Sequence, residues 1–529
     1  MKRVNSYVAA AMLALLAGGA AHAGAAGRTR ADRSCAAIAR ADFGPAIAIV
    51  SARHVSAQPG GTTPDGRGGT VGAALPAHCL VDGWIDRRSG VGGKPYGIHF
   101  QLALPDAWSG RFLLMGGGGL NGTVYPPIGP VAAGDLPALA RGFAVASHDS
   151  GHEGSVWDMS FMADQRAALD FAESSVRTVT LASRDIVARY YGRPAAHSYM
   201  TGCSTGGREG MLAMQRYPEL FDGIVIGAPA MRTGNSNLGM NYAAAMFNRA
   251  APRDAAGQPL VERIFPDSDR QTILAGLLAQ CDARDGLADG MVMDVAGCRF
   301  DPAKLRCTGE KRDGCLAPAQ VEALKLAFAG PKDASGRPAY APAPYDTGIV
   351  FAGEGGIPGY LPTGRPGPFG PPSRALDFDV DAGLAKIRED EVQQLTDTAG
   401  WTNLSTYLGH GGKVLFYHGV SDPWFSAYDT WDYWQRAAEA NGPAWAEGSR
   451  FYMVPGMSHC RGGNAYDSFD LLGPLVDWVE QDTAPPPVPA GRSDGQAGTK
   501  PLCPHPAYAH YMGGDPALAA SYACRLPAQ

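Results

Sequence analysis

Gly202-Cys203-Ser204-Thr205-Gly206 stands between a predicted strand, residues 197–201, and a helical pattern that begins near Arg208. A serine between two glycines in this setting indicates a nucleophile elbow, because the glycines permit the sharp turn that exposes the hydroxyl above a sheet. Taken alone, the pattern also describes an ordinary Ser/Gly turn. The strand-turn-helix context favours the elbow and makes Ser204 the candidate nucleophile.

A cysteine directly precedes Ser204, and another cysteine directly follows His459 in Ser458-His459-Cys460. A disulfide between Cys203 and Cys460 would bring Ser204 and His459 together, because bridged residues have Cα atoms only about 4.4–6.8 Å apart. The alternative is a free Cys203 that acts as a thiol nucleophile beside a histidine. The chain has 10 cysteines, and an even count favours disulfides over a free thiol.

The order of the cysteines does not fix their pairing, but the economical arrangement closes short loops locally. No CxxC pair occurs, which argues against a zinc site or a thioredoxin-type redox centre. The expected pairs are Cys35 with Cys79, Cys281 with Cys298, Cys307 with Cys315, and Cys503 with Cys524, which leaves Cys203 for Cys460.

The N-terminus predicts export. Lys2 and Arg3 precede a short apolar run, residues 8–17, and Ala21-His22-Ala23 is typical of a cleavage site, so residues 1–23 are expected to be a signal peptide. We therefore expect a secreted or periplasmic protein with no membrane span. A formal net charge of −6 leaves no electrostatic footprint for nucleic acid or an anionic membrane surface.

Predicted strands alternate with predicted helices in two parts of the chain, which indicates an α/β fold with a parallel sheet. The alternation covers the later half of residues 24–228 and resumes in residues 411–529. Residues 229–410 break it, with four cysteines and a Gly/Pro-rich run at Gly353–Pro372. We expect this stretch to be an inserted lid domain between two parts of one core.

An orienting acid and a base complete the candidate site. In an α/β fold with a nucleophile elbow, the catalytic residues occur along the chain in the order Ser, then Asp or Glu, then His. Asp422 follows the predicted strand 414–417, and His459 follows the predicted strand 451–454, so both project from the carboxyl ends of parallel strands. For Asp422 alone, a simple turn aspartate before proline is an equal alternative.

Other histidines compete for the role of base. His418 precedes Asp422, and His148-Asp149-Ser150-Gly151-His152 also follows a predicted strand. The second group comes before Ser204 in the chain and has the wrong order, so we interpret it as structural or as part of a pocket wall.

Acyl transfer also needs donors for an oxyanion, which in this fold are the backbone N–H after the nucleophile and one N–H from an early glycine-rich loop. Thr205 follows Ser204, and Gly116–Gly119 follows a predicted strand. Alone, four glycines predict only a flexible loop. Upstream of an elbow, they become candidate donors.

A separate loop, residues 282–291, carries Asp282, Asp285 and Asp289. Clustered carboxylates repel one another unless a cation neutralises them, and Ca²⁺ prefers oxygen ligands. The spacing is not that of an EF-hand, and two Asp-Gly turns in a solvated loop are the alternative. We expect a structural Ca²⁺ far from the chemistry.

Three motifs resemble those of the tannase and feruloyl esterase family, whose hallmark is a Cys-Ser … Asp … His-Cys set. The resemblance covers essentially the whole mature chain. It rests on Gly202-Cys203-Ser204-Thr205-Gly206-Gly207-Arg208-Glu209-Gly210, His418-Gly419-Val420-Ser421-Asp422-Pro423-Trp424-Phe425 and Val454-Pro455-Gly456-Met457-Ser458-His459-Cys460.

The resemblance implies an α/β-hydrolase core with a large inserted lid, five disulfides and Ca²⁺ in the lid. It adds the backbone carbonyls of Leu287 and Met291 to the metal ligands. It also implies Gly119 and Thr205 as oxyanion donors and Phe425 as an aromatic wall of the acyl pocket.

By this resemblance the expected function is that of a secreted serine carboxylic ester hydrolase acting on small aromatic acid esters, with feruloyl esters first. Galloyl esters (tannase activity) and terephthalate monoesters are the alternatives. The family's terephthalate-monoester enzyme has Glu where Thr205 stands and a longer lid segment at Gly353–Pro372, which favours feruloyl and galloyl esters. A non-catalytic, calcium-dependent binding protein on the same fold is the competing class, and an intact triad argues against it.

Overall fold

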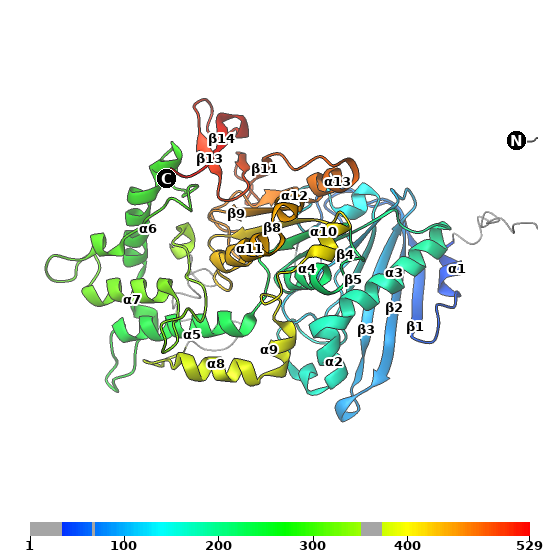
Figure 1. Ribbon diagram of the computed structural model, residues 1–529, viewed down its shortest axis with the longest axis horizontal. Coiled ribbons are helices and arrows are strands. Elements are labelled where there is room, and N and C mark those ends of the chain that lie inside the picture. Colours follow the sequence, from blue (N-terminus) through cyan, green and yellow to red (C-terminus); the bar gives the residue numbers. More distant parts are fainter. Residues whose placement is uncertain (1–33, 66–68, 351–372, 529) are drawn as a thin grey trace, which may run out of the picture.

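The fold is organised around one nine-stranded sheet, shown in the computed structural model that describes residues 34–65, 69–350 and 373–528 (Figure 1). The expected signal peptide and the Gly353–Pro372 run lie outside the described residues. In spatial order the strands are β1 (Ile47–Val55), β2 (His78–Ser89), β3 (Pro95–Pro105), β5 (Ala144–His148), β4 (Arg111–Met115), β6 (His197–Cys203), β7 (Gly223–Gly227), β8 (Lys413–Gly419) and β9 (Ser449–Val454).

The sheet has an antiparallel and a parallel half. Strands β1, β2, β3 and β5 pair antiparallel in turn, and the pairings from β5 through β4, β6, β7 and β8 to β9 are parallel. The two long strands β2 and β3 lie at one end of the molecule, away from the helices at the other end (Figure 1). The expected α/β core with a parallel sheet is confirmed.

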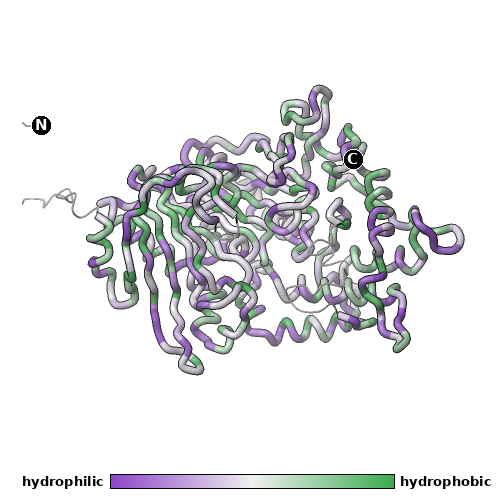
Figure 2. The backbone as a smooth tube through the Cα atoms, turned by 180° about the vertical axis from the view of Figure 1, so that it is seen from behind, coloured by the Kyte–Doolittle hydropathy of each residue, from purple (hydrophilic) through white to green (hydrophobic). Residues whose placement is uncertain are grey.

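Each parallel strand contributes side chains to two cores, because successive residues of a strand point to opposite faces. On β4, Phe112 and Leu114 join the core on one face, and Leu113 and Met115 join the core on the other. The first core is covered by α3 (Ser175–Tyr191), α4 (Thr205–Arg216), α10 (Ser405–Gly409), α11 (Ala427–Asn441) and α12 (Pro443–Gly448), and the second by α13 (Leu472–Gln481). Hydrophobic residues run along the interior strands, while many peripheral loops are hydrophilic (Figure 2).

The helical stretch over residues 165–191 contains a wider turn. Its parts are α2 (Gln165–Leu169), a π-helical turn (Asp170–Ser174) and α3. The buried Arg208 guanidinium donates to the carbonyls of Phe171 at 2.9 Å and Ala172 at 2.8 Å. A side chain that bonds into the helical ladder in this way accounts for the π turn.

Between β7 and β8 the chain forms a helical segment with its own apolar core. Figure 1 shows α5, α6, α7 and α8 grouped at the end of the molecule opposite β1. Among the described residues, the α-helices that precede α10 in this segment are α5 (Thr233–Ala250), α6 (Asp267–Cys281), α7 (Pro318–Ala329), α8 (Val380–Glu389) and α9 (Glu391–Thr396). The lid boundaries at residues 229 and 410 stay a prediction.

Small elements complete the two ends of the chain. Helix α1 (Cys35–Ala39) packs beside β1, and the C-terminal part forms a three-stranded sheet and a two-stranded sheet. Their strands are β10 (Ser468–Phe469), β11 (Val488–Gly491) and β12 (Lys500–Leu502), then β13 (Tyr508–Tyr511) and β14 (Tyr522–Arg525). Among the described residues, no helix is both long and apolar enough to span a membrane.

Five disulfides link the cysteines in the pairs expected from the sequence. They are Cys35–Cys79, Cys203–Cys460, Cys281–Cys298, Cys307–Cys315 and Cys503–Cys524. No cysteine in the described part of the chain is free, so a thiol nucleophile at Cys203 is excluded.

Candidate active site

Ser204 occupies a strained turn between β6 and α4. Its φ of 64° and ψ of −123° lie in a region that L-residues rarely adopt, as expected for a nucleophile held by its surroundings. The Ser204 N–H donates to the Gly227 carbonyl at 3.1 Å, which fixes the turn against β7. The side chain is only half-buried.

The flanking glycines leave no room for side chains. A Cβ at Gly202 would lie 2.3 Å from the Gly206 carbonyl oxygen, and a Cβ at Gly206 would lie 2.7 Å from the Gly117 carbonyl oxygen. The close approach of Gly206 to Gly117 brings the early glycine loop directly against the elbow. The Gly-x-Ser-x-Gly pattern is therefore a packing requirement at this place.

The disulfide Cys203–Cys460 joins the Ser204 turn to the His459 loop, with a Cα–Cα distance of 6.0 Å. His459 Nδ1 lies 2.6 Å from Asp422 Oδ2, a charge-assisted hydrogen bond that orients the ring. His459 Nε2 is buried and has no hydrogen-bond partner among the described residues. In free enzymes the bond from nucleophile to base is often long and tightens only with substrate.

The buried Asp422 carboxylate is held from several sides. Its Oδ1 accepts from the N–H groups of Trp424 at 2.9 Å and Phe425 at 3.1 Å. Burial favours the neutral acid, but His459 and His418 together hold the pKa of Asp422 well below its usual value. The carboxylate therefore stays ionised beside His459.

His418 supports Asp422 and is not the base. Its Nε2 lies 3.3 Å from Asp422 Oδ2 and 3.1 Å from the Phe425 carbonyl oxygen. Both neighbours are acceptors, so Nε2 carries a proton. His418 Nδ1 lies 2.9 Å from the Thr430 hydroxyl, and the ring is fully buried, away from solvent.

The two expected oxyanion donors lie on adjoining segments. The Thr205 hydroxyl donates to the Gly119 carbonyl, which ties the loop to the first turn of α4. Within the described residues, neither the Gly119 N–H nor the Thr205 N–H has a hydrogen-bond acceptor. Gly119 has a φ of +56°, and a Cβ there would lie 2.7 Å from the Val156 carbonyl oxygen.

The segment His148–His152 is buried and serves the loops around the site. Asp149 Oδ1 accepts from the N–H groups of His99 and Gly151, and burial raises its pKa. The His152 ring stacks on Phe161 at 3.6 Å, and burial lowers the pKa of His152 to about 4. These contacts agree with a structural interpretation.

Sequence reasoning missed a second Gly-x-Ser-x-Gly pentapeptide, Gly491–Gly495. It follows β11 and leads to β12 without a helix. Ser493 lies in an exposed loop, and its hydroxyl donates to Asp467 Oδ2 at 2.6 Å. The strand-turn-helix setting, and not the pentapeptide, distinguishes Ser204.

Sequence reasoning also missed Asp346, which belongs to the segment between β7 and β8. Its Oδ2 accepts from the Ser421 hydroxyl and from the Gly456 N–H, each at 2.7 Å. These two donors precede Asp422 and His459, so one buried carboxylate ties both loops together. No local pattern around Asp346 signals this contact.

Aromatic rings surround the candidate base. Phe425, predicted as a pocket wall, lies edge-on to His459 with ring centroids 5.3 Å apart, and Trp424 lies 4.5 Å from the same ring. Trp157, which is 42% exposed, meets Trp424 edge to face at 6.0 Å. Phe425 and Trp424 also line a shallow pocket together with Tyr340 from the helical segment.

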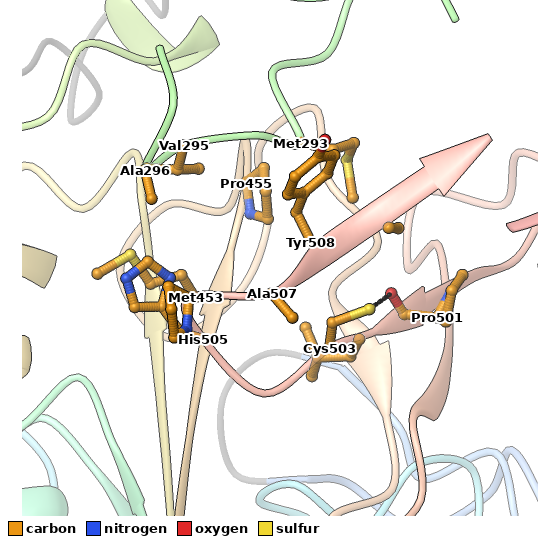
Figure 3. Close-up of a pocket in the computed structure, with 13 residues that line it drawn as sticks. Met293, Val295, Ala296, Met453, Pro455, Pro501, Cys503, His505, Ala507 and Tyr508 are labelled. Carbon is orange, nitrogen blue, oxygen red and sulfur yellow. Dashed lines mark hydrogen bonds between the residues drawn. The ribbon is translucent and has the colours of Figure 1, made fainter. Parts of the chain in front are cut away.

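A second hollow lies between β9 and the C-terminal segment (Figure 3). Met293, Met453 and His505 are among the side chains around it. Burial lowers the pKa of His505 to about 4, and its ring packs edge-on to Trp431 at 4.5 Å. This hollow contains none of the candidate catalytic residues.

The acidic loop expected to hold Ca²⁺ offers carboxylate oxygens as possible metal ligands. Several of these oxygens already accept hydrogen bonds from backbone N–H groups of the loop or of residues next to it. Asp282 accepts from the N–H groups of Asp289 and Gly290, and Asp285 accepts from those of Leu287 and Met293. Within the described residues, no three His, Cys, Asp or Glu side chains gather closely enough to hold a metal ion.

A buried cation already lies at this loop. Lys500 Nζ contacts Asp289 Oδ2 at 2.6 Å, and its side chain is only 2% exposed. Burial raises the pKa of Asp285 to about 7 despite the nearby Lys500 charge. Carboxylate oxygens are ligands that suit Ca²⁺. The described residues do not form a preformed metal-binding cluster. Ca²⁺ at this loop therefore stays a prediction.

The sheet and the Ser-His-Asp constellation define an α/β-hydrolase. The sequence profile described as "Tannase and feruloyl esterase" matches residues 85–354 and 372–525. The chain belongs to this family of carboxylic ester hydrolases. Membership of this family argues against the competing class, a non-catalytic, calcium-dependent binding protein.

Relatives of known name agree with this assignment. "Mono(2-hydroxyethyl) terephthalate hydrolase" of Piscinibacter sakaiensis is 37% identical over 518 residues and covers 86% of each chain. "Probable feruloyl esterase B-2" of Aspergillus flavus is 30% identical over 420 residues, which cover 73% of this chain and 76% of that one. The structure of feruloyl esterase B from Aspergillus oryzae superposes with a TM-score of 0.73 at 23% identity, over 93% of this chain and all of that chain, and confirms the fold.

Proposed function

We propose that this protein hydrolyses esters of aromatic carboxylic acids by a Ser-His-Asp acyl-enzyme mechanism, with hydroxycinnamoyl esters such as feruloyl esters as its main substrates. The observation that carries the proposal is the disulfide Cys203–Cys460 together with the 2.6 Å contact between His459 and Asp422. This disulfide joins the residue before Ser204 to the residue after His459, which supports a Ser-His pair.

In the first half of the reaction, Ser204 Oγ attacks the ester carbonyl carbon while its proton passes to His459 Nε2. The carbonyl π electrons move to oxygen, and the N–H groups of Gly119 and Thr205 donate to that oxyanion. The oxyanion then collapses, the bond to the alcohol oxygen breaks, and the leaving alkoxide takes the proton from His459. An acyl ester of Ser204 remains.

In the second half, His459 Nε2 takes a proton from water, and the hydroxide so formed attacks the acyl carbon. Collapse of this second oxyanion breaks the bond to Ser204 Oγ, which recovers the proton. The products are the free carboxylic acid and the original enzyme. Asp422 remains ionised throughout, and it keeps the Nδ1–H tautomer and stabilises the imidazolium.

Aromatic acyl groups are supported by the rings around His459. Phe425 and Trp424 face the base, and Trp157 extends this wall towards the surface. Aromatic pairs at such distances contribute about 0.5–1.5 kcal/mol beyond area burial. A flat aryl acid is the substrate class that uses these faces.

Terephthalate monoesters are the second candidate, because a relative that is 37% identical carries that name. Thr205 in place of Glu beside the nucleophile favours feruloyl esters. The shorter Gly353–Pro372 run is the other sequence feature that favours feruloyl esters, and it lies outside the described residues.

The disulfides bear on where the enzyme acts. Five disulfides persist in an oxidising compartment, which fits an extracellular or periplasmic enzyme. We propose that residues 1–23 direct this export and are removed.

The test is a set of initial rates on methyl ferulate, methyl gallate and mono(2-hydroxyethyl) terephthalate, for the wild type and Ser204→Ala. We expect the highest kcat/KM on methyl ferulate and no turnover of any ester by Ser204→Ala. Turnover by Ser204→Ala would overturn the mechanism, and a terephthalate monoester preferred over methyl ferulate would replace the substrate assignment.

A further inference from the structure

Glu209 is a fully buried carboxylate on α4, five residues after Ser204. Its Oε2 accepts from the Gly117 N–H at 2.8 Å, and its Oε1 accepts from the Asn121 side-chain amide at 3.0 Å. Both donors belong to the loop that carries Gly119. Among the described residues, these two are the hydrogen-bond donors that Glu209 has.

The loop meets the elbow from both sides at Gly117. The Gly117 N–H donates to Glu209, and the Gly117 carbonyl accepts from the Gly206 N–H at 3.1 Å. A Cβ at Gly117 would lie 2.0 Å from Asn121 Oδ1, so the Asn121 amide is packed directly against the loop backbone. Asn121 itself has a φ of +55°, which closes the turn.

Placing a carboxylate in the interior is costly unless it is hydrogen-bonded. Here its bonds link the helix that follows Ser204 to the segment that carries the second oxyanion donor. Oxyanion donors must lie about 2.7–3.1 Å from the developing charge to be effective. Whatever sets the distance between these two backbone segments therefore sets the geometry of the hole.

We propose that Glu209 is a positioning residue for the oxyanion hole. It holds Gly117 and Asn121 so that the Gly119 N–H faces the same point as the Thr205 N–H. The proposal rests on the proposed esterase function and adds a residue outside the triad and the donor pair. Glu209 acts through the loop and does not touch the substrate.

The test compares four variants on methyl ferulate. Glu209→Leu removes the acceptor for Gly117. Asn121→Gly removes the amide and tolerates the positive φ. Glu209→Gln retains one acceptor for Gly117, and once the Asn121 amide turns over, the Gln amide can donate to Asn121 Oδ1, which has no partner in the described structure. The control is Glu480→Gln, which breaks the ion pair of Glu480 with Arg111 at the opposite end of β4.

The measurements are kcat, KM, the inhibition constant of an aryl boronic acid, and the melting temperature. A boronic acid forms a tetrahedral adduct with the serine and places an oxygen in the oxyanion hole, so it reports the hole directly. We expect Glu209→Leu to lower kcat about 30-fold with KM little changed, and to weaken boronate binding by a similar factor. We expect a loss of about tenfold for Asn121→Gly and less than fivefold for Glu209→Gln. Glu480→Gln should lower the melting temperature and leave kcat and boronate binding unchanged.

Wild-type kcat and boronate binding in folded Glu209→Leu would overturn the proposal while leaving the esterase function intact. If Glu209→Leu does not fold, Asn121→Gly decides, and an unchanged kcat there would overturn the proposal. If Glu480→Gln lost as much kcat as Glu209→Leu, the effect of Glu209 would be one of general stability, and the proposal would be overturned. Failure of the proposed function is distinguishable, because then the wild type itself would not hydrolyse the ester.

Discussion

Removing the bridge between the serine and histidine loops should impair catalysis more than stability alone explains. The Cys203–Cys460 disulfide closes a separation of 257 residues. The loop-entropy relation gives about 5.5 kcal/mol for that closure as an upper value. Without the bridge, His459 is still held by Asp422 at 2.6 Å, and the Ser204 N–H still bonds the Gly227 carbonyl.

We therefore expect Cys203→Ala/Cys460→Ala to fold at reduced temperature with kcat lowered about 10- to 100-fold, because a displacement of 1 Å in a catalytic group costs about that much. The matched control is Cys503→Ala/Cys524→Ala, whose separation of 21 residues lies in the C-terminal part. It should lose about 3 kcal/mol of stability without loss of kcat. The assay is hydrolysis of methyl ferulate at a temperature where circular dichroism shows both variants folded. Full kcat in the first variant, or equal losses in both, would refute the reasoning.

Three further predictions concern separate parts of the molecule. Asp422→Asn should lower kcat about 10⁴-fold with the fold retained, as measured by initial rates, because the imidazole loses its tautomer; a loss below tenfold would contradict the assigned role. The hydrogen bond from Arg88 holds the pKa of the Asp164 carboxyl well below its usual value, so Asp164→Asn should lower the melting temperature at pH 7, and this difference should shrink as the pH falls below about 4; a difference as large at pH 2 as at pH 7 would count against the ion pair. Dialysis against EDTA should lower the melting temperature and added CaCl₂ should restore it; an unchanged value would show that the loop needs no metal and would leave Lys500 as its cation.

The sequence predicted the parts of the fold and site that depend on local patterns. Residues 112–115 and 414–417 are continuous apolar stretches, typical of buried parallel strands, and the structure places β4 and β8 there. The Ser204 elbow and the five disulfide pairs were also accessible, because they depend on spacing and on an even number of cysteines.

The contacts that support the site could not be read in the same way. Glu209 and Asp346 accept hydrogen bonds from backbone N–H groups that are remote in the chain and have no sequence signature. The π turn beside α3 depends on Arg208, which belongs to another helix. Long-range polar contacts of this kind appear only once the fold is assembled.

The most direct measurement is mass spectrometry of the protein quenched during turnover of an aryl ester, followed by peptide mapping. The account predicts an aromatic acyl group on the peptide that contains Ser204 and no acyl group in Ser204→Ala. An acyl group on another residue, or continued hydrolysis by Ser204→Ala, would contradict the account.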